Sequence, residues 1–136
     1  MAGVFTGKVF RPLTPYDMVL EFHKTFGAGI NEDIQNDTIR FFREKLIREE
    51  EAEVSKELFP LNDIVSKSKL TKELADLMYV TIGTAIAFGL PLEEVFAEVH
   101  KSNMSKLTKE GYVLRREDGK VLKSDQYQEP DLEKYF

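Results

Sequence analysis

One segment, residues 66–89, limits the fold of this chain more than any other. Its centre, Leu74-Ala75-Asp76-Leu77-Met78-Tyr79-Val80, is apolar around nearly the whole circumference of a helix, and apolar residues continue to Phe88. A helix of that kind is buried on most of its sides. One small bundle has too little surface to cover it, so we expect the chain to assemble as an oligomer.

Start and stop signals place three further helices around this segment. Each predicted helix starts at a Ser, Thr, Asn, Asp or Pro residue, and each ends at or before a Gly or Pro residue. The predicted helices run from Thr14-Pro15 to about Phe26, from Asn36 or Asp37 to before Pro60, from Ser66 or Ser68 to Gly89, and from Pro91 to before Gly111.

The segment after Gly111 is polar and rich in turn residues. Asp118-Gly119 stands between two short runs that carry apolar residues, which predicts a tight hairpin turn. The predicted fold class is therefore all-α: a four-helix bundle with a short hairpin-like C-terminal tail, in a single domain that spans residues 1–136.

Composition excludes several classes of function. The net charge of −5 argues against a partner that is a nucleic-acid polymer, which needs a basic surface. Cysteine is absent, which excludes disulfides and thiolate metal sites. No apolar run approaches ~18 residues, so we expect no membrane span. Met1 to Lys8 lacks the pattern of a signal peptide, so we expect a cytoplasmic protein, in the host cytoplasm if a phage encodes it.

Acidic residues recur at helical spacing on the second and third predicted helices. Glu49, Glu50 and Glu53 lie on the second helix, and Glu73 and Asp76 lie on the third. Residues three or four apart share a helix face, so two antiparallel helices can bring these carboxylates together. Carboxylates that close need a compensating charge, and Mg²⁺ or Mn²⁺ supplies it while leaving positions for water and phosphate oxygens. The pattern predicts phosphate chemistry.

A plainer interpretation of the acidic residues is a solvated helix face. Arg43, Lys45 or Arg48 could pair with Glu49 or Glu51 on the second helix. Asp76 argues against this interpretation because it lies within an apolar run, where we expect it to be buried and where an unpaired charge is costly. The acidic pairs on both helices together favour a metal.

The surroundings of these acids also match a known pattern. The chain contains Glu49-Glu50-x-x-Glu53, a gap, and Glu73-x-x-Asp76. It therefore resembles the MazG-like and phosphoribosyl-ATP pyrophosphohydrolase-like all-α nucleotide pyrophosphohydrolases. The similarity covers most of the chain, including Asn103-x-x-Lys106 and the tail from Asp118 to Lys123. The tail favours the compact phage and bacterial branch, which includes dGTP-hydrolysing phage enzymes of the MazZ type.

The resemblance implies an activity and a set of site residues. Members cleave a nucleoside or deoxynucleoside triphosphate between the α and β phosphates, which gives a monophosphate and pyrophosphate. Glu49 and Glu50 are the implied catalytic residues, and Glu49 is either a further metal ligand or the base that orients the attacking water. The implied ligands of two or three Mg²⁺ or Mn²⁺ ions are Glu50, Glu53, Glu73 and Asp76.

Other implied contacts hold the substrate. The phosphates are expected to meet Asn103, Lys106, Lys120, Lys123 and Tyr127, with the tail, residues 111–136, closing over the site of its own or a neighbouring subunit in a homodimer or homotetramer. Phe22, His23 and Phe26 are spaced to line a slot for a planar base, although Phe residues on such a helix are commonly core residues and a single His is commonly just hydrogen-bonded.

Two alternatives stay open at this stage. One is a phosphoribosyl-ATP pyrophosphohydrolase, which shares the carboxylate chemistry. The other is a helical binding or oligomerisation module without enzymatic activity, whose acids form surface salt bridges and whose stability does not respond to divalent cations.

Overall fold

The computed structural model describes residues 3–6 and 9–136. The chain divides into two compact units, Met1–Leu90 and Pro91–Phe136. The first unit contains two short strands, β1 (Gly3–Thr6) and β2 (Val9–Pro12), which pair antiparallel, and three helices. The helices are α1 (Pro15–Phe26), α2 (Asp37–Leu58) and α3 (Lys67–Phe88).

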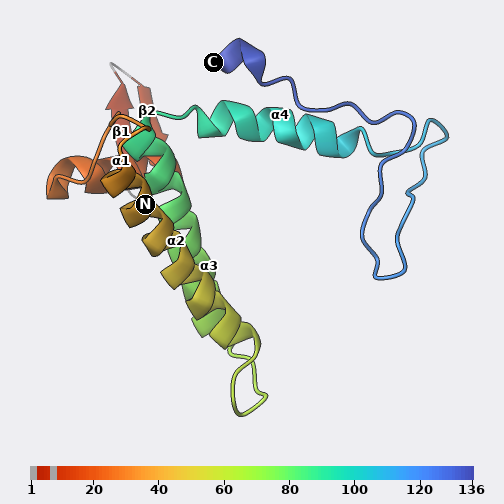
Figure 1. The fold of residues 1–136 in the computed structure, drawn as a ribbon, viewed down its shortest axis with the longest axis horizontal. Coiled ribbons are helices and arrows are strands. Elements are labelled where there is room, and N and C mark those ends of the chain that lie inside the picture. The colour runs from red at the N-terminus through yellow and green to blue at the C-terminus, as the bar shows by residue number, and fades with distance from the viewer. Residues whose placement is uncertain (1–2, 7–8) are drawn as a thin grey trace. The chain divides into compact units, whose positions relative to one another are not determined.

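Helices α2 and α3 lie side by side as an antiparallel hairpin, and α1 packs against α3 (Figure 1). Polar side chains cap the starts of α1, α2 and α3, as the sequence predicts. Thr14 forms a capping box with Asp17 at the start of α1, Asn36 accepts a hydrogen bond from the Ile39 amide, and Ser66 accepts one from the Lys69 amide. These contacts satisfy amides that the helix itself leaves free.

The buried apolar core of the first unit gathers at one end of α3. Its members are Val19 of α1 and Ile82, Ala85, Ile86 and Ala87 of α3, whereas Val54 of α2 is buried near the other end of α3. The expectation that residues 66–89 are buried on most sides is therefore right for the carboxyl half of α3. In the amino half, Leu74 and Met78 are 49% and 52% exposed in the single chain. The reason is that, within the first unit, α1 packs on the carboxyl half of α3, and the described helix that packs along its amino half is α2.

A polar junction, formed by the side chains of Arg43 and His23 beside Gly83 of α3, lies inside this core. Arg43 of α2 is buried, and its guanidinium donates to the Thr84 hydroxyl at 3.1 Å and the Val80 carbonyl at 3.0 Å on α3. Burial lowers the pKa of Arg43. His23 of α1 is also buried, and its Nδ1 lies 2.7 Å from the carbonyl oxygen of Gly29. A carbonyl only accepts hydrogen bonds, so Nδ1 carries the hydrogen.

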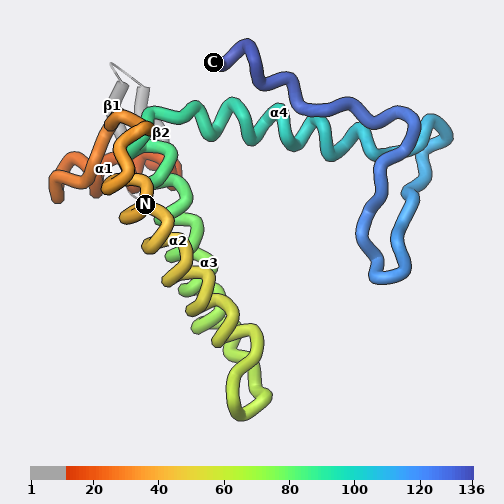
Figure 2. The backbone as a smooth tube through the Cα atoms, in the orientation of Figure 1, coloured from red at the N-terminus to blue at the C-terminus, as the bar shows by residue number. Residues whose placement is uncertain are grey.

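The second unit contains α4 (Leu92–Met104), a short 3₁₀ helix η1 (Glu133–Tyr135) and the polar tail between them. The tail forms the predicted hairpin: Arg115 and Val121 make an antiparallel bridge, and Gly119 takes φ of +90° in the turn. The chain then returns along α4 (Figure 2), where Ser102 donates to the Gln128 carbonyl at 2.7 Å. Lys134 and Glu98 pair at 2.6 Å and fasten its end.

These elements bear out the predicted all-α class, with four helices at the expected positions. The hairpin of β1 and β2 was not expected from the sequence. The prediction about an export signal at Met1–Lys8 falls partly on residues outside the described ones. Among the described residues, no single helix is long and apolar enough to cross a membrane. Of the described helices, only α3 and α4 taken together, as a bent pair, have the required length and hydrophobicity. A single domain of 1–136 stays a prediction.

Gly83 provides a test of the polar junction. A Cβ at this position would lie 2.6 Å from Arg43 Nη2 and 2.9 Å from His23 Nε2. Glycine to alanine within a helix normally stabilises by ~1 kcal/mol, but forcing two buried polar groups apart costs more. We expect Gly83→Ala to lower the free energy of unfolding by about 1–2 kcal/mol, measured by urea denaturation. Ala75→Gly, at an exposed site of α3, gives the ordinary helix effect as a control. A Gly83→Ala protein more stable than wild type would mean that Arg43 and His23 can move aside at little cost in free energy.

Candidate metal centre

The hairpin of α2 and α3 brings three of the predicted acids to one point. Glu50 comes from α2, and Glu73 and Asp76 come from successive turns of α3. One carboxylate oxygen from each residue lies within 4.8 Å of the other two. The antiparallel packing predicted from helical spacing thus joins acids that are more than 20 residues apart in the sequence.

Lys72 supplies part of the charge that this cluster needs. Its ammonium lies 2.7 Å from Asp76 Oδ2 and 3.4 Å from Glu73 Oε1. The side chain of Glu73 is 14% exposed and that of Asp76 is 37% exposed. The expectation that Asp76 is buried is therefore wrong for the single chain: within the first unit, α1 packs on the other half of α3, and Asp76 reaches both solvent and Lys72.

The three carboxylates still repel one another despite the positive charge of Lys72. Partial burial, followed by the negative charges of Asp76 and Glu73, raises the pKa of Glu50, while Lys72 acts in the opposite direction. The hydrogen bond and charge of Asp76 in turn raise the pKa of Lys72. Three convergent carboxylate oxygens with an excess of negative charge form a donor set that fits a hard divalent cation, which prefers oxygen ligands.

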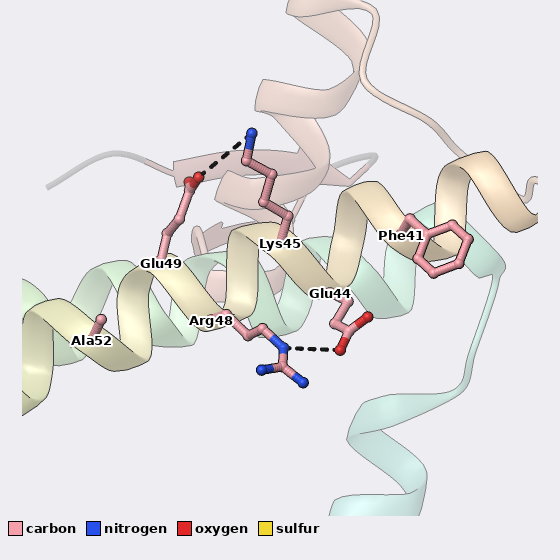
Figure 3. A pocket seen from close by; sticks show the side chains of 6 residues that line it. All are labelled: Phe41, Glu44, Lys45, Arg48, Glu49 and Ala52. Carbon is pink, nitrogen blue, oxygen red and sulfur yellow. Dashed lines mark hydrogen bonds and ion pairs between the residues drawn. The ribbon is translucent and has the colours of Figure 1, made fainter.

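The two other acids of the α2 motif lie differently. Glu53 is close enough for its charge to raise the pKa of Glu50, but its carboxylate pairs with Lys56 at 3.0 Å. Glu49 lies on another face of α2, where it pairs with Lys45 at 4.0 Å beside the Glu44–Arg48 pair (Figure 3). Neither residue belongs to the group of three, so their predicted metal or catalytic roles remain predictions.

The predicted base-binding residues separate into two kinds. His23 is buried and hydrogen-bonded to Gly29, which is the plainer interpretation considered from the sequence. Phe22 and Phe26 are exposed, and their ring centroids lie 4.6 Å apart. Tyr79 of α3 meets Phe22 edge to face, with centroids 5.6 Å apart. The aromatic cluster, Phe22, Phe26 and Tyr79, thus starts one helical turn after Asp76 on α3.

The predicted phosphate-binding residues all belong to the second unit. Asn103 is exposed near the end of α4, and Lys106 lies in the turn after it, where its amide donates to the Asn103 carbonyl at 3.2 Å. Lys120 is exposed beside the hairpin turn. Lys123 lies over the Tyr127 ring, 4.5 Å from its centroid. Their contact with the carboxylate cluster stays a prediction.

Lys72 and Tyr79 were missed by reasoning from the sequence. A signal existed for both, because Lys72 precedes Asp76 by four residues and Tyr79 follows it by three. Both spacings put the side chains on the helix face that carries the acids.

The raised pKa of Glu50 predicts a pH-dependent effect on stability. A carboxyl group whose pKa is raised on folding costs stability when it ionises, so the cost appears as pH rises through the folded-state pKa. Without metal, Glu50→Gln should therefore raise Tm by about 2 °C at pH 7 and lose this advantage in acid, where wild-type Glu50 is protonated. Differential scanning fluorimetry in a chelator measures this.

Added Mn²⁺ should make wild type more stable than Glu50→Gln, because only wild type keeps all three carboxylate ligands and gains stability from metal binding by mass action. Glu51→Gln removes the same charge from an exposed neighbouring site and should change neither measurement. A metal-free Glu50→Gln protein less stable than wild type at pH 7 would contradict the account of the cluster.

Comparison with known proteins agrees with this geometry. A family model described as phosphoribosyl-ATP pyrophosphohydrolase matches residues 19–103, which include the whole carboxylate cluster and Asn103. No match is found among curated proteins. Members of the family typically depend on a divalent metal, in keeping with the acidic cluster. The chain belongs to the phosphoribosyl-ATP pyrophosphohydrolase family of MazG-like, all-helical nucleotide pyrophosphohydrolases.

Proposed function

We propose that this protein is a metal-dependent pyrophosphohydrolase of nucleoside or deoxynucleoside triphosphates, which cleaves between the α and β phosphates. The observation that carries the proposal is the convergence of Glu50, Glu73 and Asp76, with oxygens within 4.8 Å, inside the segment that matches the family. A role in phage nucleotide metabolism, with dGTP as substrate, is the specific form of this proposal.

The side chains divide the work of hydrolysis. Glu50, Glu73 and Asp76 would hold Mg²⁺ or Mn²⁺, and Glu53, which pairs with Lys56, would be a further ligand. A bound divalent cation supplies positive charge where phosphoryl transfer develops negative charge. Glu49 is proposed as the base that orients the attacking water or as a ligand of a further ion. Water adds to one of the two phosphorus atoms of the α–β bridge, the bond from that atom to the bridging oxygen breaks, and the proton of the water passes to Glu49 or to solvent. A monophosphate and pyrophosphate leave, and no covalent nucleophile is needed.

Polar and cationic residues of the second unit are proposed to hold the triphosphate. Asn103 and Lys106 meet the phosphates near the metal, and Lys120, Lys123 and Tyr127 close over them from the tail. Lysine suits this task because its ammonium is a compact charge on a flexible stem. The proposal extends to a tail that acts on its own or a neighbouring subunit.

A homodimer or homotetramer is part of the proposal. Exposed apolar side chains on α1 and the amino half of α3, including Met18, Leu74 and Met78, support it because single chains rarely leave such residues grouped in water. A second copy would cover the side of α3 that α1 leaves open.

The base is proposed to bind at the aromatic cluster. Phe22, Phe26 and Tyr79 offer ring faces and edges near Asp76, whereas His23 is turned inward toward Gly29. Planar bases stack well on such rings.

Phosphoribosyl-ATP is a second candidate substrate, because the description of the matching family names its hydrolysis. It carries the same bond between α and β phosphates. The carboxylate cluster would act on it in the same way, so the choice between the two candidates depends on the substrate's base and sugar.

A substrate panel tests both candidates. Wild-type protein should release pyrophosphate and a monophosphate from at least one canonical or modified dNTP, NTP or phosphoribosyl-ATP with Mg²⁺ or Mn²⁺. Glu50→Gln and Asp76→Asn should each lower kcat/KM by at least about 100-fold, because each removes a ligand charge. Glu51→Gln should retain activity. If no substrate is cleaved, the chain is a helical binding module instead.

The aromatic cluster is tested through substrate affinity. Phe22 contacts both Phe26 and Tyr79, so Phe22→Ala should raise KM for the preferred nucleotide about tenfold, with little change in kcat. The ranking of bases should also flatten. Phe59→Ala, at an exposed residue beyond the end of α2, is the matched control and should leave KM unchanged. An unchanged KM and ranking for Phe22→Ala would put the base elsewhere.

A further inference from the structure

Lys72 touches the same carboxylates that the proposed metal would use. Its ammonium contacts Asp76 Oδ2 at 2.7 Å and Glu73 Oε1 at 3.4 Å. It also opposes the rise in the pKa of Glu50, so its charge is felt by all three acids of the cluster. Lys72 therefore acts as the resident counter-ion of the site.

We propose that Lys72 is an intramolecular competitor of the metal ion, which holds Asp76 and Glu73 when the metal is absent and releases Asp76 when the metal binds. This inference rests on the proposed function, because it requires these carboxylates to be metal ligands. It assigns to Lys72 a role in setting the metal concentration at which the site fills.

The contact distances mean that the metal ion and the Lys72 ammonium cannot both bind the same oxygen of Asp76. An oxygen that accepts a direct hydrogen bond from an ammonium at 2.7 Å has its lone pair engaged, and a divalent cation beside that ammonium would repel it. Asp76 Oδ2 is thus available to a metal ion only after Lys72 has moved. Glu50 has no such direct contact with Lys72 in the described ion pairs, so it can receive the ion first.

The position of Lys72 makes this exchange easy. Its side chain is 67% exposed, so the ammonium can move into water without a change in the backbone. Lys72 also precedes its acidic partner by four residues, and a helix favours this order less than the reverse. The pair is strong enough to steady the metal-free cluster and weak enough to open for an ion.

Metal titration of three proteins tests the inference. Mn²⁺ binding is measured by isothermal titration calorimetry on the full chain as wild type, Lys72→Met and Lys69→Met. Lys69→Met removes the same charge from an exposed site one turn earlier on α3. Lys72→Met should bind Mn²⁺ about fivefold more tightly than wild type, the factor expected when an exposed ion pair no longer has to break. Lys69→Met should bind like wild type.

Stability without metal supplies an independent readout. In chelator, Lys72→Met should have a lower Tm than Lys69→Met, because the three acids lose their counter-ion. Tighter Mn²⁺ binding together with lower metal-free stability supports the inference. Equal or weaker Mn²⁺ binding by Lys72→Met overturns it while leaving the metal centre intact. Absence of Mn²⁺ binding by all three proteins overturns the metal centre itself and the inference with it.

Discussion

The antiparallel packing of α2 on α3 is the interaction on which the rest of the structure depends. It buries Val54 of α2 near the start of α3, and it lets Arg43 reach Val80 and Thr84 across the carboxyl half of the interface. The same packing sets Glu50 opposite Glu73 and Asp76. A change of register by one residue would turn Glu50 by about 100° around α2 and separate the acids. Core packing and site geometry are thus fixed by one interface.

The interface has two ends with different physical character. At the carboxyl end of α3, small and apolar residues, Gly83 and a buried Arg–His junction give a dense interior. At the amino end, apolar and acidic residues are half exposed. The first end is the better packed of the two, and the second carries the proposed site. This division is common because strained groups at a functional site must be held in place by a well-packed region elsewhere.

The carboxylate cluster is a small example of electrostatic strain within a stable scaffold. Glu50, Glu73 and Asp76 would repel one another, and partial burial adds to the cost of ionising Glu50. A lysine on the same helix offsets part of that repulsion. The packing of α2 on α3 therefore holds the three carboxylates together with Lys72 as their counter-ion. The aromatic cluster one turn further along α3 extends this face beyond the acids.

The sequence by itself determined the helices, their approximate ends and the family. Thr14, Asn36, Ser66 and Gly89 act through local hydrogen bonds and backbone conformation, which neighbouring residues dictate. Spacing also identified the acids, since three- and four-residue intervals define a helix face wherever the helix lies. The sequence could not reveal which acids meet. Glu49 and Glu50 are adjacent in the chain, yet the packing of α2 on α3 directs only Glu50 to the cluster and leaves Glu49 with Lys45.

The burial of Asp76 and the position of His23 were likewise decided by tertiary structure. Asp76 stands in an apolar run, but exposure depends on which helix covers that turn, and α1 covers a different one. His23 faces inward because the Gly29 carbonyl accepts its hydrogen bond and the distant Gly83 leaves room beside its ring. Periodicity fixes the faces of a helix. Only packing decides which face meets a partner, because that depends on contacts between residues far apart in the chain.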